Sequence, residues 1–174
     1  MEIQGKSALV TGAGSGIGRA ISLALANAGA SVVVADVDHV GGLETVRLIQ
    51  ENAGNAMFIG ADVSTPAGIR SMFVDAGDVD IVCNNAGIMT GDTPGWPEVP
   101  LEKIHLVLNT NTAGVIMGTR EAVEVLGRRG GGVVINTASV AGLAPMPFDP
   151  IYSASKAAVI NFTQSCAQLN EWKN

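Results

Sequence analysis

The feature that most constrains the fold is a regular alternation of short apolar runs with segments of helical periodicity. Five runs are almost continuously apolar and predict strands, at residues 8–10, 32–35, 57–59, 81–83 and 133–135. Such strands are typical of a parallel sheet covered by helices on both faces. Since helical segments separate the runs, the order predicts an α/β fold with a doubly wound parallel sheet and right-handed crossovers.

The helical segments are defined by apolar spacing and by their end signals. The first covers residues 17–28 and stops before a glycine. Another is expected to begin at Ser64, Thr65 and Pro66, where the Ser64 hydroxyl would cap the helix and the proline fits its first turn. The remaining helices are predicted around residues 43–49 and over residues 101–127 and 152–170.

Composition excludes several classes of protein. The chain is 47% hydrophobic and 15% charged with 22 glycines, which is typical of one globular domain, residues 1–174, with buried strands and tight ligand loops. Ten Lys and Arg against sixteen Asp and Glu argue against a nucleic-acid partner. No apolar stretch approaches the ~18 to 20 uncharged residues of a membrane span. Because Cys83 and Cys166 lack metal-ligand spacing and the first residues lack a secretory signal, we expect a reduced, cytoplasmic protein without a metal.

A glycine-rich turn follows the first predicted strand and opens the first predicted helix. Glycines here let the main chain approach a pyrophosphate, and the helix N-terminus offers it free N–H groups and a partial positive charge. The spacing is G-x-x-x-G-x-G rather than the commoner G-x-G-x-x-G, and the pattern alone fits a plain structural turn equally well. The turn contains Gly12, Gly14, Ser15, Gly16, Ile17 and Gly18.

The position of Asp36 favours a dinucleotide site over a plain turn. This residue ends the second predicted strand, 18 positions after Gly18, where a carboxylate can accept hydrogen bonds from both ribose hydroxyls of an adenosine. It would also repel a 2′-phosphate, and no cation stands at Ser15, Val37 or Asp38 to bind one. The electrostatics therefore favour NAD over NADP.

Two further loops are expected beside this turn. Asp62 and Val63 follow the third predicted strand, and Asn85, Ala86 and Gly87 follow the fourth. Because the carboxyl ends of parallel strands meet at one edge of a sheet, both loops are predicted to line the same nucleotide cleft.

Candidate catalytic residues lie at the same edge and at the start of the last helix. Tyr152 is the only tyrosine, and Lys156 follows it by four residues, so both side chains share one helix face. An ammonium group beside a phenol stabilises the phenolate and makes the tyrosine a usable general acid and base. Ser139 follows the fifth predicted strand and would place a hydroxyl group nearby. Alone, the Tyr-x-x-x-Lys spacing fits an exposed helix pair better than a catalytic pair.

With these motifs in this order, the chain resembles the short-chain dehydrogenase/reductase family from Met1 to its end. The resemblance implies a Rossmann-type fold and an oxidoreductase that transfers a hydride between NAD(H) and a secondary alcohol or ketone. It rests on the glycine turn, Asp62, Asn84 to Gly87, Asn111 in Asn-Thr-Ala-Gly, Ser139, and Tyr152 to Lys156. The prolines before the tyrosine are similar to the hydroxyprostaglandin dehydrogenase branch; they are Pro145, Pro147 and Pro150.

The resemblance also implies roles for single residues. Tyr152 would give or take the hydroxyl proton, Lys156 would hold the nicotinamide ribose, and Ser139 would orient the carbonyl group. Asn111 would hold a water that links Lys156 to solvent, although an amide satisfied within the long helix is the plainer interpretation. The residues implied to bind the cofactor are Gly12, Gly14, Ser15, Gly16, Ile17, Gly18, Asp36, Asp62, Val63, Asn85, Ala86, Gly87, Tyr152 and Lys156.

Family members usually continue past the end of this chain with one or two more strands. The resemblance therefore implies a sheet that lacks the C-terminal strands, and we expect that the domain over residues 1–174 is incomplete at its C-terminus because the natural protein has further residues. The alternative function is a truncated, catalytically incomplete NAD-binding module or scaffold. It also implies a homodimer or homotetramer in which the helices at residues 101–127 and 152–170 pair across a two-fold axis.

Two other catalytic arrangements lack their companion motifs. The segment from Ser153 to Lys156 satisfies the S-x-x-K pattern of serine β-lactamases, but Ser-Asp-Asn and Lys-Thr-Gly are absent from the sequence. A Ser-His-Asp triad would need His39 or His105, and no G-x-S-x-G turn is present.

The substrate is expected to be a small alcohol or ketone with a lipid-like or alicyclic body. This expectation comes from apolar candidates for the pocket wall, any of which could equally belong to the core. The substrate-binding candidates are Ser139, Met146, Phe148 and Trp96, with Met89, Val140 and Ile151 as further wall residues.

Overall fold

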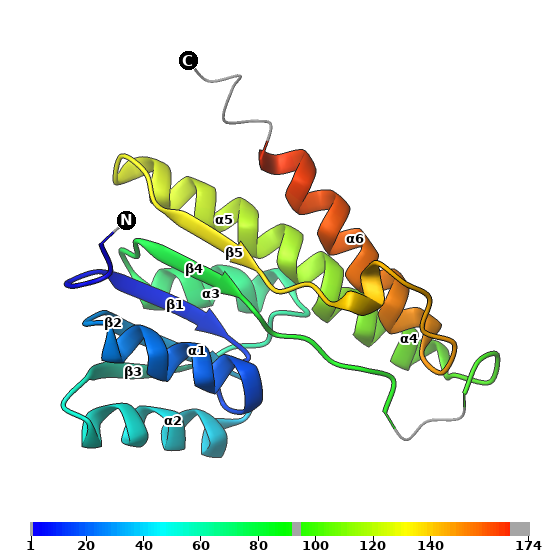
Figure 1. Cartoon of the computed structure of the whole chain (residues 1–174), viewed down its shortest axis with the longest axis horizontal. Coiled ribbons are helices and arrows are strands. Elements are labelled where there is room, and N and C mark those ends of the chain that lie inside the picture. Colours follow the sequence, from blue (N-terminus) through cyan, green and yellow to red (C-terminus); the bar gives the residue numbers. More distant parts are fainter. Residues whose placement is uncertain (1, 92–94, 168–174) are drawn as a thin grey trace.

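A computed structural model describes residues 2–91 and 95–167 of the chain. Five parallel strands form one sheet in the order β3-β2-β1-β4-β5 (Figure 1). This order reverses direction between β1 and β4, which opens a crevice at the carboxyl ends of the strands. The strands are β1 (Ser7–Thr11), β2 (Ser31–Asp36), β3 (Asn55–Gly60), β4 (Ile81–Asn84) and β5 (Val133–Asn136). The predicted doubly wound sheet is confirmed.

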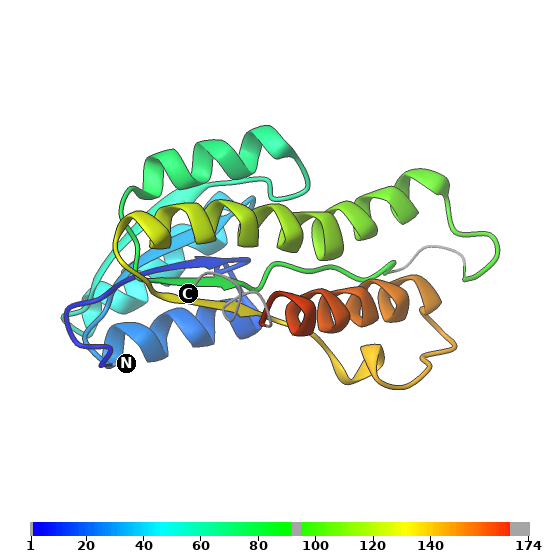
Figure 2. The same cartoon turned by 90° about the horizontal axis from the view of Figure 1, so that it is seen from above.

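Helices cover both faces of the sheet. Figure 2 shows α3 and α5 on one side of the sheet, and α1 and α6 on the other. The helices are α1 (Gly16–Asn27), α2 (His39–Glu51), α3 (Pro66–Ala76), α4 (Leu101–Leu108), α5 (Gly114–Arg128) and α6 (Pro150–Ala167). A π-helical turn (Asn109–Ala113) joins α4 to α5, and a 3-10 turn (Val140–Gly142) precedes α6.

Successive strand residues enter two separate apolar layers, as the pleat of a strand requires. Val10 of β1 belongs to the layer that contains Ile49 of α2. Its neighbour Leu9 belongs to the layer that contains Met72 of α3 and Val125 of α5. The core therefore fixes the sheet from both sides and leaves its carboxyl edge free for the site.

The expectation that every strand is buried on both faces holds only at the centre of the sheet. All residues of β4 are buried, and so are four of the five residues of β1. On the edge strands Met57 is 48% exposed, Val133 36% and Ile135 46%. An edge strand has a neighbour on one side only, so apolar composition does not guarantee its burial.

The long helix predicted over residues 101–127 is interrupted. The chain stays helical from Leu101 to Arg128, but residues Asn109–Ala113 form a π-helical turn. Such turns insert one extra residue into a helix and are frequent at functional sites. The apolar spacing continues on both sides of the turn, which is why the sequence predicted one uninterrupted helix.

The cap of α3 also differs from the prediction. Thr65 is the N-cap, and its Oγ1 accepts a hydrogen bond from the Gly68 N–H at 3.1 Å. The Ser64 hydroxyl instead donates to Oδ1 of Asp62 at 2.7 Å. The last predicted helix begins two residues early, at Pro150, and its predicted end at residue 170 lies outside the described residues.

Among the helices in the described residues, none combines the length and the apolarity that crossing a membrane requires.

Candidate active site

The carboxyl ends of the strands open onto a cavity of about 820 Å³. Loops that follow all five strands line this cavity, together with the start of α1, the π-helical turn and the start of α6. Every residue predicted to bind the cofactor lines it except Gly14. The candidate catalytic residues Ser139, Tyr152 and Lys156 line the same cavity.

The glycine turn gives the cavity a wall made of main chain. Gly12 has a φ of +64°, and a Cβ built on it would lie 2.8 Å from the Cα of Ala86. Only glycine permits this approach of the turn to the loop after β4. Gly16 has a φ of +48°, and no atom lies within 4 Å of a Cβ built on it. At Gly16 the main chain is therefore open toward the cavity, as a phosphate cradle requires.

The N-terminus of α1 directly continues the glycine turn and faces the same cavity. Ser15 is the N-cap with an extended backbone, and its side chain makes no capping hydrogen bond in the described part of the chain. The first turn of α1 contains no acidic residue, and Gly16, Ile17 and Gly18 all line the cavity. Uncapped N–H groups and the helix dipole at this point suit an anionic group such as a pyrophosphate.

Asp36 is held by two main-chain N–H groups. Its Oδ2 accepts from Gly14 at 2.7 Å, and its Oδ1 accepts from Asp38 at 2.9 Å. Because each carboxylate oxygen has further acceptor capacity, Asp36 can still accept two hydroxyl groups from the cavity side. Gly14 thus contributes to the site by orienting Asp36, rather than by lining the cavity.

Thr11 organises the loop after β4 and was missed as a site residue from the sequence. Its Oγ1 accepts hydrogen bonds from the N–H groups of Asn85 at 3.0 Å and Ala86 at 3.1 Å. The Asn85 side chain donates to the Thr11 carbonyl at 3.0 Å and accepts from the Thr137 hydroxyl at 3.3 Å. Asn85 therefore ties three strand ends together. The signal was available, because Thr11 directly precedes the glycine turn.

Lys156 is buried beside Tyr152. Its Nζ donates to the Thr137 carbonyl at 2.8 Å and lies 5.8 Å from the centre of the Tyr152 ring. Lys156 is only 3% exposed, and burial lowers the pKa of its ammonium group below the ordinary value. A buried ammonium group without a carboxylate partner among the described residues is a costly arrangement, which is typical of functional sites.

Ser139 stands at the end of the loop after β5. Its Oγ accepts a hydrogen bond from the Ala141 N–H at 3.2 Å and caps the 3-10 turn. Ser139 and Tyr152 line the cavity together. The Ser139 hydroxyl retains its own proton for donation to a ligand, because in this cap it acts as an acceptor.

Asn111 lies in the π-helical turn and is fully buried. Its Oδ1 accepts from the Ile88 N–H at 2.8 Å, and its Nδ2 donates to the Ile88 carbonyl at 2.8 Å and to the Ser155 Oγ at 3.0 Å. The side chain is thus satisfied by two other elements and not within the long helix. Its role in a proton relay remains a prediction.

The predicted substrate-binding residues are not gathered in one place. Ser139 lines the main cavity, whereas Met146 lines a second, open cavity of about 410 Å³ between the 3-10 turn and α6. Trp96 and Phe148 are 63% and 75% exposed and line neither cavity. Ile151 is buried against Val99 and Val107. Of the other wall candidates, Met89 is 43% and Val140 81% exposed.

Several residues that line the main cavity were not predicted. They come from the loop ends and from the α4 side, where the sequence pattern carries no chemical signal. They are Val37, Ala61, Ile88, Leu106, Thr110, Thr137 and Ala138.

Three other side chains of nucleophile or base type, those of Cys83, His39 and Ser153, are buried or in contact with other groups. Burial raises the pKa of the Cys83 thiol to about 11, so this thiol is a poor nucleophile. The His39 ring packs edge-on against Phe58 at 5.1 Å. The Ser153 hydroxyl donates to the Ala141 carbonyl at 2.5 Å.

Comparison with known proteins identifies the family of this chain. A sequence profile of the family described as short chain dehydrogenase matches residues 6–173. The chain belongs to this family. An uncharacterized oxidoreductase of Thermotoga maritima is 39% identical over 170 residues, which cover 96% of this chain and 66% of that protein. The 15-hydroxyprostaglandin dehydrogenase (NAD(+)) of Homo sapiens is 35% identical over 176 residues, which cover 96% of this chain and 62% of that protein.

A solved structure extends this comparison. A short-chain dehydrogenase/reductase from Burkholderia phymatum in complex with NAD superposes with a TM-score of 0.89 at 35% identity. The match covers 95% of this chain and 60% of that chain. This chain therefore spans at most about two thirds of the length of these three relatives.

Proposed function

We propose that this protein is an oxidoreductase that uses NAD to interconvert a secondary alcohol and a ketone. The observation that carries the proposal is that Ser139, Tyr152 and Lys156 line the same cavity as the N-terminus of α1 and Asp36. The main cavity would thus bring the residues for nucleotide binding and the group for proton transfer together, which is the arrangement that hydride transfer to a cofactor needs.

The residues of the cavity fit a dinucleotide. The open main chain at Gly16 and the uncapped start of α1 suit the pyrophosphate, and the spare acceptor capacity of Asp36 suits the adenosine ribose. The carboxylate disfavours a 2′-phosphate, which supports NAD over NADP. Two of the relatives carry NAD in their descriptions. The bound dinucleotide would supply the hydride acceptor or donor.

The residues of this chain would supply position and proton transfer. The buried ammonium group of Lys156 lies close to the Tyr152 ring and would stabilise the phenolate form. Tyr152 would then take the proton of the substrate hydroxyl during oxidation and return it during reduction. Ser139 would donate its hydroxyl proton to the substrate oxygen and hold it beside Tyr152.

We also propose a class of substrate, an assembly and a location for the protein. The main cavity carries apolar wall residues such as Ile88 and Leu106, which suits a substrate with an apolar body. Exposed apolar residues on α4 and α5, among them Leu101, Ile116 and Val123, suit a homodimer or homotetramer. Two free cysteines suit the reducing cytoplasm.

The first test is calorimetric titration of the chain with NAD and with NADP. It is followed by a spectroscopic screen for NADH formation with secondary alcohols. Selective NAD binding with turnover supports the proposal. Binding without turnover favours the alternative, a catalytically incomplete NAD-binding module, and no binding overturns the assignment of the cofactor.

Two variants test the assigned roles. Tyr152→Phe should bind NAD normally and lose turnover by about 10² to 10⁴, the usual contribution of a general acid and base. Turnover that survives this change would refute the mechanism. Asp36→Ala should shift the preference toward NADP, and unchanged discrimination would mean that another group contacts the ribose.

A further inference from the structure

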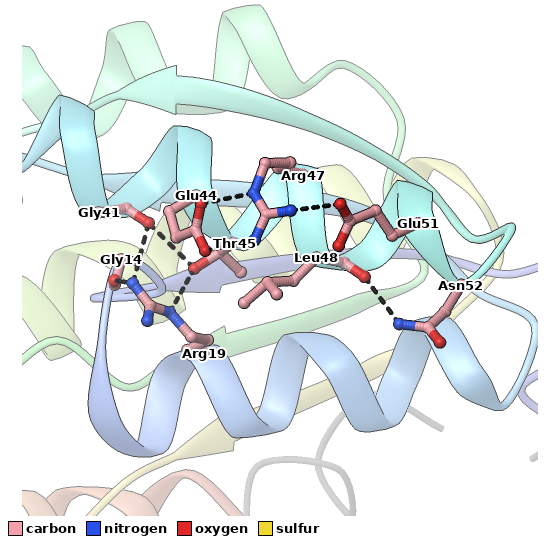
Figure 3. A network of polar contacts seen from close by, with 9 residues as sticks. All are labelled: Gly14, Arg19, Gly41, Glu44, Thr45, Arg47, Leu48, Glu51 and Asn52. Carbon is pink, nitrogen blue, oxygen red and sulfur yellow. Dashed lines mark hydrogen bonds and ion pairs between the residues drawn. The ribbon is translucent and has the colours of Figure 1, made fainter.

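Arg19 hydrogen-bonds to the glycine turn without lining the main cavity. This residue of α1 is half-buried, and its guanidinium group reaches toward the start of α2 (Figure 3). Nε donates to the Thr45 Oγ1 at 2.9 Å. Nη2 donates to the carbonyl of Gly14 and, at 3.3 Å, to the carbonyl of Gly41. One side chain thus joins α1, the glycine turn and α2.

The partner of Arg19 is itself fixed. Thr45 is fully buried, and its hydroxyl faces the carbonyls of Ala13 at 2.8 Å and Gly41 at 3.1 Å. Arg19 and Thr45 together therefore hold the carbonyl groups of both Ala13 and Gly14. A planar guanidinium group can make such a set of bonds in one orientation, whereas an ammonium group cannot reproduce the fork.

This contact reaches Asp36 through Gly14. The Gly14 carbonyl accepts from Arg19, and the Gly14 N–H donates to Asp36 at 2.7 Å. A Cβ built on Gly14 would lie 2.9 Å from the Asp36 Oδ2, so the two groups are packed without spare room. The orientation of Gly14 hence decides the orientation of the carboxylate.

We propose that Arg19 is a positioning residue for cofactor choice: by fixing Gly14 it holds Asp36 in the orientation that accepts the ribose hydroxyls of NAD and rejects the 2′-phosphate of NADP. This inference rests on the proposed function, because it assigns the ribose to Asp36. Arg19 lines no part of the main cavity and acts only through the turn.

The matched control is Arg47 on α2, which Figure 3 shows next to this network. Arg47 pairs with Glu44 at 2.7 Å and with Glu51, both on its own helix. It makes no contact with the glycine turn among the interactions of the described residues. Replacing either arginine by methionine removes one positive charge, but only Arg19→Met releases Gly14.

The experiment is calorimetric titration of wild type, Arg19→Met and Arg47→Met with NAD and with NADP. We expect the ratio of the two affinities to fall about tenfold or more in Arg19→Met, the effect of losing one hydrogen bond from a charged group. The ratio should stay unchanged in Arg47→Met. A long-range charge effect would weaken NADP more than NAD, so a higher preference for NAD in Arg19→Met would overturn the proposal.

A double-mutant cycle separates positioning from general stability. If Arg19 acts through Asp36, Arg19→Met should change NAD affinity little in an Asp36→Ala background. Equal losses for both dinucleotides, or losses that add to those of Asp36→Ala, would refute the proposal. Should Arg19→Met fail to fold, Thr45→Val removes the hydroxyl that accepts from Nε and should lower the ratio in the same direction; an unchanged ratio overturns the proposal.

Amide exchange measures the same link without cofactor. In the folded Arg19→Met variant the Gly14 N–H should exchange faster than in wild type, whereas Arg47→Met should leave it unchanged. Unchanged exchange in both variants overturns the proposal. If wild type binds neither dinucleotide, the proposed function and this inference fall together. If wild type selects NAD and Arg19→Met selects it equally well, only the inference falls.

Discussion

Replacement of Asn111 by alanine tests how the π-helical turn is fastened to the site. The amide group of Asn111 is fully buried and makes three hydrogen bonds, two to the main chain of Ile88 and one to Ser155. Asn111→Ala removes all three. The Ile88 N–H and carbonyl then lose this partner, and the described residues show no other hydrogen bond to either group.

The magnitude follows from these two main-chain groups. A buried polar group left unsatisfied costs about 1–3 kcal/mol, so two of them cost about 2–6 kcal/mol. Water that enters the space left by the side chain moves the cost toward the lower bound. We therefore expect a loss of at least about 2 kcal/mol in the free energy of unfolding, a large part of the roughly 5–15 kcal/mol of an ordinary domain. In a chain of 174 residues, this corresponds to a fall in Tm of about 4–8 °C.

The assay is urea unfolding followed by circular dichroism, with Asn161→Ala as the control. Asn161 lies on α6 and is exposed, so its replacement should change stability by no more than about 0.5 kcal/mol. If Asn111→Ala loses less than about 1 kcal/mol relative to this control, Asn111 does not fasten the turn and the reasoning is refuted.

Three further predictions concern the fold and its charges. Gly18→Ala should destabilise the fold by about 1–3 kcal/mol, because its Cβ would collide with the Gly12 carbonyl. Gly127→Ala should stabilise α5 by about 0.5–1 kcal/mol, because its Cβ would meet no neighbouring atom within 4 Å. A Tm for Gly18→Ala that is not below that of Gly127→Ala would contradict both expectations. Because burial lowers the pKa of Lys156 from its ordinary value of 10.5, the unfolded chain binds more protons as pH approaches that value, so stability should rise there with pH. Lys156→Met should flatten the rise in urea unfolding; an equal slope would refute the cause. The pKa of Asp80 lies below its ordinary value of 3.8, chiefly because the Ser7 N–H donates to its carboxylate and to a smaller extent because of Arg129. The free energy of unfolding should therefore fall in acid as Asp80 becomes protonated. Asp80→Asn should weaken this acid dependence in urea unfolding.

The sequence predicted the sheet because strand burial and chain order carry most of the information about a doubly wound fold. The central strands are apolar on both faces, and the carboxyl ends of β1, β2 and β5 bring the glycine turn, Asp36 and Ser139 to one edge of the sheet. Position relative to a strand end was the decisive signal. It placed eleven of the twelve cofactor-binding residues predicted after strand ends around the cavity, and the helix spacing of Tyr152 and Lys156 placed these two there as well.

What the sequence did not predict depends on local choices that apolar spacing cannot distinguish. Adjacent Ser64 and Thr65 are both capping residues, and only the extended backbone of Thr65 decides between them. The π-helical turn leaves the apolar pattern of residues 101–127 intact. Trp96 and Phe148 were chosen for their apolar rings, but loop geometry leaves both of them exposed.

Helix α6, which carries the candidate catalytic residues, is joined to the candidate site by polar contacts rather than by the apolar layers of the sheet. Ser155 accepts from Asn111 and donates to the Tyr152 carbonyl at 2.7 Å, which ties α6 to the π-helical turn. Asp149 is 2% exposed, accepts from the Tyr152 N–H at 3.0 Å, and also accepts from Thr90 in the loop after β4 at 2.9 Å. Tyr152 is therefore positioned from both sides by side chains that hydrogen-bond to its own main chain. Hydrogen bonds fix direction as well as distance, so these contacts hold in place the main chain from which the Tyr152 side chain reaches the cavity.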